Sequence, residues 1–461
     1  MESIRHVAAK ESIDGNRTSR SPWRVFLDEP LRSKAEGASL WVAEHLCDPE
    51  YVQQVAILAK EQSSSSQWDH SHPWSAAEFA LFYWHIALCF PGQSRQTIAH
   101  HYLKLVATRS QQRNLTSPGL FGGVSGIAFV IQQFSKAGQR YQQTLTRLHQ
   151  SIAEQVRGHS SWHIPPNGGI AEPEFDLITG AAGIVGYLAS VPTPDLAVQD
   201  TLHTLLDYLL ALTAPGEEPG KERWFSPPSL LITEQARHDY PCGRFNCGLA
   251  HGIAGPLTAL ALVAMAGYDV PGLLESIAYV SQWLVDHQIY DEWGVTWPAA
   301  IPYELASSPE QWRSLPASRT AWCYGAPGIA RSLWLAGQVL KEERLMNIAL
   351  DALKAVLRRP ESERNISAPI LCHGSAGLLL ICLHFAHESL DPFILAHIPH
   401  LVERILEQFD PQSPLGFRNI EPGGRLVDQP DLLTGAAGTA LALLAAACEV
   451  APSWDRLLLL S

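Results

Sequence analysis

The chain has 461 residues, of which 46% are hydrophobic, and its formal net charge is −13. Because nucleic-acid binding requires a basic face, this acidic balance argues against nucleic acid as a partner. The length allows about two or three average domains, or one domain built from repeated units. Eight cysteines are too few for a disulfide scaffold, so a cluster of Cys and His residues indicates metal binding or catalysis.

The N-terminal segment is polar, and we expect residues 1–36 to form a poorly ordered lead-in to a single domain over residues 37–461. Hydrophobic spacing over residues 37–60 predicts one or two amphipathic helices. The first twenty residues contain no apolar core of a secretory signal, and no apolar run reaches the roughly 18 residues that a membrane span needs. We therefore expect a cytoplasmic protein without a transmembrane segment.

A short motif, Gly-x-x-Gly followed by an aliphatic stretch, recurs at intervals of roughly 50 to 75 residues. Six copies carry both glycines, and residues 74–90 resemble a degenerate first copy without them. The first glycines of the six copies are Gly123, Gly180, Gly252, Gly325, Gly374 and Gly435. For all of these glycines we prefer a role in close helix packing over phosphate binding.

The segments that follow the glycines are apolar almost all round, which is typical of buried helices. The segments between them, such as residues 200–212, 274–287 and 345–358, are amphipathic. This alternation predicts an all-α fold in which an inner ring of buried helices is wrapped by an outer ring. If the inner helices all begin at one end, the residues just before each glycine motif meet at one mouth. Those residues are Asp176, His251, Cys323, Tyr324, Cys372 and His373.

Two good transition-metal ligands, Cys372 and His373, stand side by side just before Gly374. With Cys323 from the preceding copy they make three protein ligands, the number expected when zinc keeps its fourth position open for a reactant. The alternative for each cysteine is simple burial in the core. A rival zinc pair is Cys247 with His251, because residues four apart share one face if the segment is helical.

Four motifs together resemble the lanthionine synthetase C-like family, the LanC cyclases of lantibiotic biosynthesis. They are Asp176-Leu177-Ile178-Thr179-Gly180, Gly248-Leu249-Ala250-His251-Gly252, Trp322-Cys323-Tyr324-Gly325 and Cys372-His373-Gly374. The resemblance runs from about residue 74 to the C-terminus. It implies an α/α toroid with seven inner and seven outer helices, consistent with the repeat count.

The resemblance also implies roles for individual residues. It assigns one zinc ion per chain to Cys323, Cys372 and His373, and acid/base chemistry to His251 and Asp176. Arg319 falls where the family places an arginine in the site, and Tyr324 matches the tyrosine of stand-alone bacterial cyclases. The resemblance assigns the acid/base role to Asp176 and not to Asp431. Asp431 holds the same place in the last copy, and we interpret it as a helix N-cap.

The implied reaction is addition of peptide cysteine thiols to dehydroalanine or dehydrobutyrine, which forms lanthionine or methyllanthionine rings. The expected partners are a dehydrated precursor peptide, a separate dehydratase and an exporter, and a peripheral association with the membrane in such a complex is compatible with the sequence. Two alternatives remain: a LanC-like scaffold that binds glutathione, another thiol or a peptide without turnover, and addition of glutathione. A carbohydrate-active toroid with paired carboxylates is less favoured, because Asp176 is the one acid in the predicted mouth.

Overall fold

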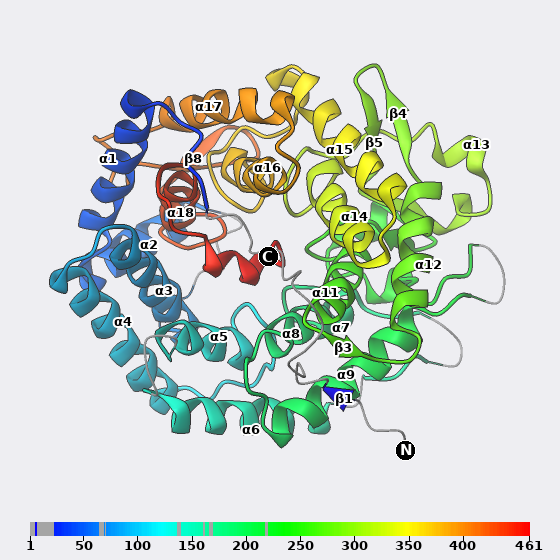
Figure 1. The fold of residues 1–461 in the computed structure, drawn as a ribbon, viewed down its shortest axis with the longest axis horizontal. Helices are drawn as coiled ribbons and strands as arrows, with labels where there is room; N and C mark the ends of the chain where they lie inside the picture. The colour runs from blue at the N-terminus through cyan, green and yellow to red at the C-terminus, as the bar shows by residue number, and fades with distance from the viewer. Residues whose placement is uncertain are drawn as a thin grey trace, which may run out of the picture.

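The structure is a computed structural model that describes residues 5–6, 23–63, 69, 71–135, 140–159, 162–165, 169–216 and 220–461. Within these residues, two concentric rings of helices surround the centre of the molecule (Figure 1). The inner ring consists of α3 (Pro73–Cys89), α5 (Val124–Ser135), α8 (Ala181–Leu188), α11 (Ala254–Met265), α14 (Ala326–Leu340), α16 (Ser375–Ser389) and α18 (Ala436–Ala447). The outer ring consists of α1 (Glu29–His45), α4 (Gln93–Gln112), α6 (Gln142–Gly158), α9 (Leu196–Thr213), α12 (Leu273–Asp286), α15 (Glu343–Arg358) and α17 (Pro392–Leu406).

Each inner helix contacts the next inner helix, and α18 contacts α3, so the inner ring is closed. Each of α3 to α16 packs against the outer helix that follows it in the chain, whereas α18 packs against α1 from the other end of the chain. The α/α toroid with seven inner and seven outer helices is therefore confirmed for the described residues. The amphipathic segments predicted for the outer ring coincide with α9, α12 and α15.

Shorter elements lie between and beside the two rings. The remaining helices are α2 (Pro49–Gln62), α7 (Glu172–Phe175), α10 (Glu234–Asp239), α13 (Pro309–Trp312) and the 3-10 helices η1 (Pro228–Leu230), η2 (Tyr303–Leu305), η3 (Glu361–Glu363) and η4 (Ser453–Leu458). Where the structure describes the chain, eight short strands form antiparallel pairs: β1 (Arg5–His6) with β3 (Tyr268–Asp269), β2 (Arg244–Asn246) with β6 (Ala300–Pro302), β4 (Ile289–Asp291) with β5 (Gly294–Thr296), and β7 (Asn419–Glu421) with β8 (Arg425–Val427). Among these pairs, β2–β6 leads directly into the predicted mouth.

Helix α1 closes the outer ring and begins earlier than the sequence indicates. The side chain of Asp28 accepts a hydrogen bond from the backbone N–H of Leu31, and Pro30 occupies the first turn, so both residues favour a helix start at Glu29. The boundary expected at residue 37 falls inside this helix. Trp23 also belongs to the packed structure, because its indole N–H donates to the carbonyl oxygen of Ala445 at 2.8 Å.

The second glycine of a motif is required where one inner helix meets the preceding copy. A Cβ atom on Gly328 would overlap the carbonyl oxygen of Trp322 and would lie 2.9 Å from Cβ of Leu249 in the preceding copy. Gly438 meets Leu371 in the same way, at 2.7 Å from its Cδ1. These distances are shorter than a side chain tolerates, so the packing role of these glycines is confirmed.

The first copy forms an inner helix without the glycines. At the start of α3, the imidazole Nδ1 of His72 accepts from the backbone N–H of Trp74, which caps the helix. The Trp74 ring then lies against Gly126 of the next copy, at a distance that leaves no room for a Cβ. A large side chain in α3 therefore fills the space that the glycine of α5 leaves open.

The C-terminal segment occupies the centre of the ring (Figure 1). Leu457, Leu458, Leu459 and Leu460 are fully buried. Arg331 of α14 is 1% exposed and donates to the carbonyl oxygen of Leu460 through its guanidinium Nε at 2.9 Å. The end of the chain thus packs into the core of the toroid. In the described part of the chain, no helix is both long enough and apolar enough to cross a bilayer.

Candidate active site

The residues that precede the glycine motifs are joined by backbone hydrogen bonds from copy to copy. The N–H of Ala250 donates to the carbonyl oxygen of Cys323 at 3.2 Å, and the N–H of Cys323 donates to that of Cys372 at 3.2 Å. The N–H of Cys372 donates to the carbonyl oxygen of Leu433 at 2.8 Å, and the N–H of Leu177 donates to the carbonyl oxygen of Ala250 at 3.1 Å. This chain of bonds fixes equivalent positions of successive copies side by side, so the predicted convergence at one mouth is present.

The two predicted metal-binding cysteines lie next to each other. Cys323 is 5% exposed, and its thiol and that of Cys372 share a hydrogen bond. This hydrogen bond from Cys372 lowers the pKa of Cys323, with the charges of Arg319 and His251 acting in the same direction and burial opposing them. The pKa of Cys372 is correspondingly raised. Cys323 therefore loses its proton more readily than Cys372, as expected for two adjacent thiols that share a site.

His373 is the neighbour of Cys372 in the chain and lines a cavity of about 1270 Å³ together with Arg319. Burial, and then the charge of Arg319, lower the pKa of His373 to about 4. The imidazole is therefore neutral near pH 7, and neutral imidazole is the form that binds metal ions. Other parts of the cavity wall come from Trp74, Phe121 and the β7–β8 hairpin.

The donor chemistry of Cys323, Cys372 and His373 fits a zinc ion, because zinc prefers thiolate and neutral imidazole ligands. In the described ranges, no group of three or more His, Cys, Asp or Glu side chains is arranged so that it could hold a metal ion. The two thiols are in contact, and the imidazole is adjacent in the chain without completing such a cluster. Zinc binding by these three residues remains a prediction.

The rival zinc pair has a different geometry from the one that its spacing suggests. Cys247 follows strand β2, and α11 begins only at Ala254, so Cys247 and His251 do not share a helical face. The Cys247 side chain is fully buried, and burial raises its pKa to about 12. A thiol in that environment is unreactive, and it belongs to the core.

His251 and Asp176 form a close pair. The imidazole Nδ1 of His251 lies 2.6 Å from Oδ2 of Asp176, whose side chain is 1% exposed. The other carboxylate oxygen, Oδ1, accepts from the backbone N–H groups of Thr179 and Gly180 at 2.8 Å each. The turn before α8 therefore fixes the carboxylate, and the carboxylate fixes the imidazole.

The charge state of His251 follows from this pair. Burial alone lowers the pKa of an imidazole, but the hydrogen bond and charge of Asp176 outweigh it, with smaller contributions from Glu172 and Cys323. The pKa of His251 is therefore raised above its ordinary value. Its side chain remains 37% exposed, so the ring is accessible while its Nδ1 is engaged.

Tyr324 lies on the side of His251, whereas Arg319 lies on the side of His373. The ring centroids of Tyr324 and His251 are 6.4 Å apart. Arg319 and His373 share the cavity described above, but Asp176, His251, Cys323 and Tyr324 lie outside its lining. The charges of both Arg319 and His251 act on the Cys323 thiol, so both groups lie near it.

Asn246 and the Glu172–Arg244 ion pair are neighbours of the site that the sequence did not single out. Asn246 Nδ2 donates to the hydroxyl oxygen of Tyr324 at 3.2 Å. Glu172 accepts from Arg244 Nε at 2.7 Å and from its Nη2 at 2.8 Å, and both side chains are largely buried. Arg244 and Asn246 belong to β2 and Glu172 belongs to α7, and no local motif predicts the contacts that these residues make.

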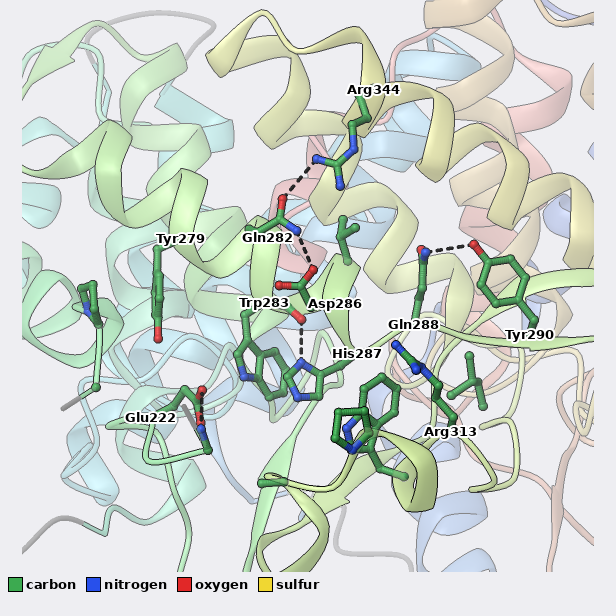
Figure 2. Close-up of a pocket in the computed structure, with 18 residues that line it drawn as sticks. Glu222, Tyr279, Gln282, Trp283, Asp286, His287, Gln288, Tyr290, Arg313 and Arg344 are labelled. Atoms are coloured by element: carbon green, nitrogen blue, oxygen red, sulfur yellow. Dashed lines mark hydrogen bonds between the residues drawn. The ribbon is translucent and has the colours of Figure 1, made fainter. Parts of the chain in front are cut away.

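A second cavity, of about 940 Å³, lies outside the rings at the C-terminal end of α12 (Figure 2). Trp283 and His287 stack there with ring centroids 4.1 Å apart, and Glu222 lies beside Trp283. No predicted site residue lines this cavity. Four other tryptophans, Trp224, Trp297, Trp322 and Trp454, are fully buried and are core residues rather than sugar-binding platforms.

Asp431 accepts from the backbone N–H of Thr434 at 2.6 Å. The N-cap position of α18 is Gly435, which carries no side-chain cap, so the predicted N-cap role of Asp431 is wrong. The side chain of Asp431 instead accepts hydrogen bonds from Thr434 within the turn that precedes the helix. The reason is that the motif inserts a complete turn between the aspartate and the first helical residue.

Comparisons with known proteins agree with this geometry. Residues 76–459 match the family model described as lanthionine synthetase C-like protein. The nisin biosynthesis protein NisC of Lactococcus lactis subsp. lactis is 25% identical over 325 residues, which cover 69% of this chain and 74% of that protein. A solved structure of nisin cyclase superimposes with a TM-score of 0.71 at 21% identity, covering 90% of this chain and 98% of the other. At that identity the structural likeness shows the shared fold.

Proposed function

The chain belongs to the lanthionine synthetase C-like family, and from this membership and the geometry of its mouth we propose that it is a zinc-dependent lanthipeptide cyclase. Its substrate would be a precursor peptide in which serine or threonine has already become dehydroalanine or dehydrobutyrine. Its product would be a peptide with lanthionine or methyllanthionine rings. The observation that supports this proposal most directly is the meeting of Cys323, Cys372 and the Asp176–His251 pair at one end of the inner ring.

The proposed reaction is an internal addition without oxidation or reduction. The sulfur of a peptide cysteine forms a bond to the β-carbon of the dehydro residue, and the electron pair of the double bond moves to give an enolate. One proton leaves the thiol and one proton is delivered to the α-carbon, so the product has the mass of the starting peptide. The site must therefore accept a proton, donate a proton and stabilise a transient negative charge.

His251 is the proposed proton carrier. Because Nδ1 is engaged by Asp176 at 2.6 Å, Nε2 is the nitrogen that remains for exchange with the peptide. The raised pKa of His251 favours the protonated ring, which is the form that delivers a proton to the α-carbon. Asp176 orients the ring and stabilises its positive charge, and its own position is fixed by two backbone N–H groups.

Arg319 is the proposed electrostatic group for the enolate. Its charge acts on Cys323, Cys372 and His373, so it lies close to the predicted ligand set. A guanidinium placed beside a developing enolate oxygen lowers the barrier, because the charge is already oriented when the oxyanion forms. Cys323, Cys372 and His373 would hold one zinc ion per chain. The ion would supply a Lewis acid that keeps an incoming thiol, whose pKa is ordinarily about 8.5, in its nucleophilic form.

The zinc assignment is tested by elemental analysis of the purified protein. We expect about one zinc per chain in the wild type, loss of zinc in Cys323→Ala and Cys372→Ala, and retention in Cys247→Ala. The Cys247 variant is a matched control because it removes a thiol that is fully buried beside β2. A wild-type protein without zinc, or zinc that is lost with Cys247, would contradict the assignment.

Ring closure is tested on a peptide that carries one dehydroalanine and one cysteine. Because addition leaves the mass unchanged, the remaining free thiol is alkylated and counted by mass spectrometry. Loss of the alkylated product with time indicates a cyclase, whereas binding of the peptide with an unchanged thiol count indicates a scaffold without turnover. Addition of glutathione is distinguished by the mass increase of the peptide.

The proposed partners of the enzyme are a dehydratase and an exporter. The proposed location of the enzyme is the cytoplasm.

A further inference from the structure

Asn246 at the end of β2 connects the turn before His251 to the side chain of Tyr324. It is 1% exposed, and its Oδ1 accepts from the backbone N–H of Gly248 at 3.0 Å. Its Nδ2 donates to the hydroxyl oxygen of Tyr324 at 3.2 Å. The same residue therefore contacts two segments that are far apart in the chain.

The hydrogen bond to Gly248 decides which way the amide faces. A backbone N–H can only donate, so the oxygen of the Asn246 amide must face Gly248 and the NH₂ group must face Tyr324. The phenol oxygen of Tyr324 consequently receives a hydrogen bond. In the described part of the chain no second hydrogen bond of this hydroxyl is found, so its own proton is available to another acceptor.

The Tyr324 ring and the Asn246 backbone are both held in place. A Cβ on Gly248 would lie 2.7 Å from Cδ1 and 2.8 Å from Cε1 of Tyr324, so the ring lies directly against the Gly248 backbone. The carbonyl oxygen of Asn246 accepts from the N–H of Ile253 at 2.9 Å, and Asn246 pairs with Ala300 of β6. The hydroxyl is thus fixed in position as well as in donor direction.

We propose that Asn246 is a positioning residue that sets Tyr324 as a hydrogen-bond donor to the reacting peptide. This inference rests on the proposed cyclase function and goes beyond it by assigning the direction of one proton. The oxygen that gains negative charge when the thiol adds is the acceptor that the Tyr324 hydroxyl would meet. The phenol keeps its proton throughout, and no covalent bond to Tyr324 forms or breaks. Hydrogen bonds in series strengthen one another, so the Asn246 amide makes the phenol a better donor.

Asn246→Asp separates this role from a structural one. The carboxylate has the same shape and still accepts from Gly248, but it cannot donate to Tyr324. Instead it accepts a hydrogen bond from the phenol O–H and turns that donor away from the peptide. We expect Tyr324→Phe to lower kcat by roughly 10²-fold, the effect of losing one oxyanion donor, and Asn246→Asp to lower it to a similar extent. KM for the dehydrated peptide should change by less than about twofold, because ground-state binding is not affected.

The double variant provides the decisive measurement. If Asn246 acts through Tyr324, Asn246→Asp in the Tyr324→Phe background should change kcat by less than about twofold. Ser226→Ala is a matched control, because Ser226 is equally buried beside β2 but its hydroxyl donates to the carbonyl oxygen of Ile170. We expect that control to retain wild-type kcat. Thermal unfolding of every variant shows whether the fold is retained.

Each other outcome contradicts a specific statement. If Asn246→Asp keeps wild-type kcat, or lowers it equally in both backgrounds, Asn246 has only a structural role. If Tyr324→Phe keeps wild-type kcat, the donor role of Tyr324 is wrong while the cyclase function stands. If Asn246→Asp fails to fold, Asn246→Ala is compared in the same two backgrounds, and equal losses in both overturn the inference. If the wild type closes no ring, the proposed function itself is wrong.

Discussion

Two copies of one turn, Asp-Leu-x-Thr-Gly, occur in the inner ring, before α8 and before α18. Asp176 and Asp431 are 1% and 6% exposed, and each accepts from the backbone N–H of the threonine three residues later. The first turn lies beside His251, whose Nδ1 is hydrogen-bonded to the second carboxylate oxygen of Asp176 at 2.6 Å. In the second turn the hydroxyl of Thr434 takes that place, at 2.9 Å from Oδ2 of Asp431.

The difference between the two turns comes from the neighbouring copy rather than from the turn itself. The copy after Asp176 supplies His251 at the position before its first glycine. The copy that α18 meets when the ring closes is the one without glycines, and there Glu78 of α3 accepts from the N–H of Leu432 at 2.8 Å. A carboxylate that accepts hydrogen bonds within a turn thus also becomes the partner of an imidazole when a histidine is placed against its second oxygen.

Replacing His251 should remove the difference between the two turns and should have the largest effect on kcat. We expect His251→Asn to lower kcat for ring closure by about 10²- to 10⁴-fold, the range for loss of a general acid or base. The side chain is 37% exposed, so its replacement opens no large internal cavity, and thermal unfolding checks that the fold is retained. Thiol alkylation with time measures the rate. A variant that closes rings at the wild-type rate would remove His251 from the mechanism.

Replacing Asp176 by Asn should have a smaller but still large effect. The amide oxygen can still accept from Thr179 and Gly180, so the turn is kept while the charge beside His251 is lost. We expect kcat to fall roughly 10- to 100-fold, because the imidazole loses its orientation and the stabilisation of its charged form. His251→Asn/Asp176→Asn should be no slower than His251→Asn alone, whereas a further loss in the double variant would show that Asp176 acts independently of His251.

The pH profile gives a second way to examine the first turn. The pKa of His251 is raised above 6.5 because the effect of Asp176 outweighs burial. The stabilisation of the fold from this group is therefore complete below pH 6.5 and is lost as the pH rises through the folded pKa. If the protonated ring is the donor, kcat should fall as the pH rises through the same folded pKa. In Asp176→Asn that fall should move to lower pH, and an unshifted profile would assign it to another group.

Much of the fold and part of the site follow from the sequence because they are encoded in repeated local patterns. The glycine motifs and the alternation of apolar and amphipathic segments gave the two rings, and the start of each inner helix at one end gave the mouth. Cys323 and Cys372 occupy equivalent positions of successive copies, so one backbone hydrogen bond, Cys323 N–H to Cys372 O at 3.2 Å, is enough to bring them together.

Other features of the site depend on contacts between distant segments and have no local signal. Asn246 ends β2, one of two paired three-residue strands that no periodicity identifies, and it contacts Tyr324 from a segment 78 residues away. The Glu172–Arg244 pair likewise joins the short helix α7 to β2. The sequence also does not distinguish Asp176 from Asp431 on physical grounds, because the distinguishing histidine comes from another copy. That choice rested on the family resemblance, and the 2.6 Å contact with His251 supplies its physical reason.

Asp431→Asn is the matched variant of the second turn and should have the smallest effect. Burial raises the pKa of Asp431 above 3.8, although bonds from Thr434 partly oppose it. The contribution of this group to stability is thus complete below pH 3.8 and is lost as the pH rises through the folded pKa, so the ionised side chain weakens the fold at neutral pH. Asparagine is neutral and its oxygen still accepts from Thr434. We expect an unfolding temperature at pH 7 equal to or above that of the wild type, and kcat within about threefold of it. Thermal unfolding and the ring-closure assay measure both quantities, and a loss of kcat as large as that of Asp176→Asn would show that the second carboxylate also takes part in the chemistry.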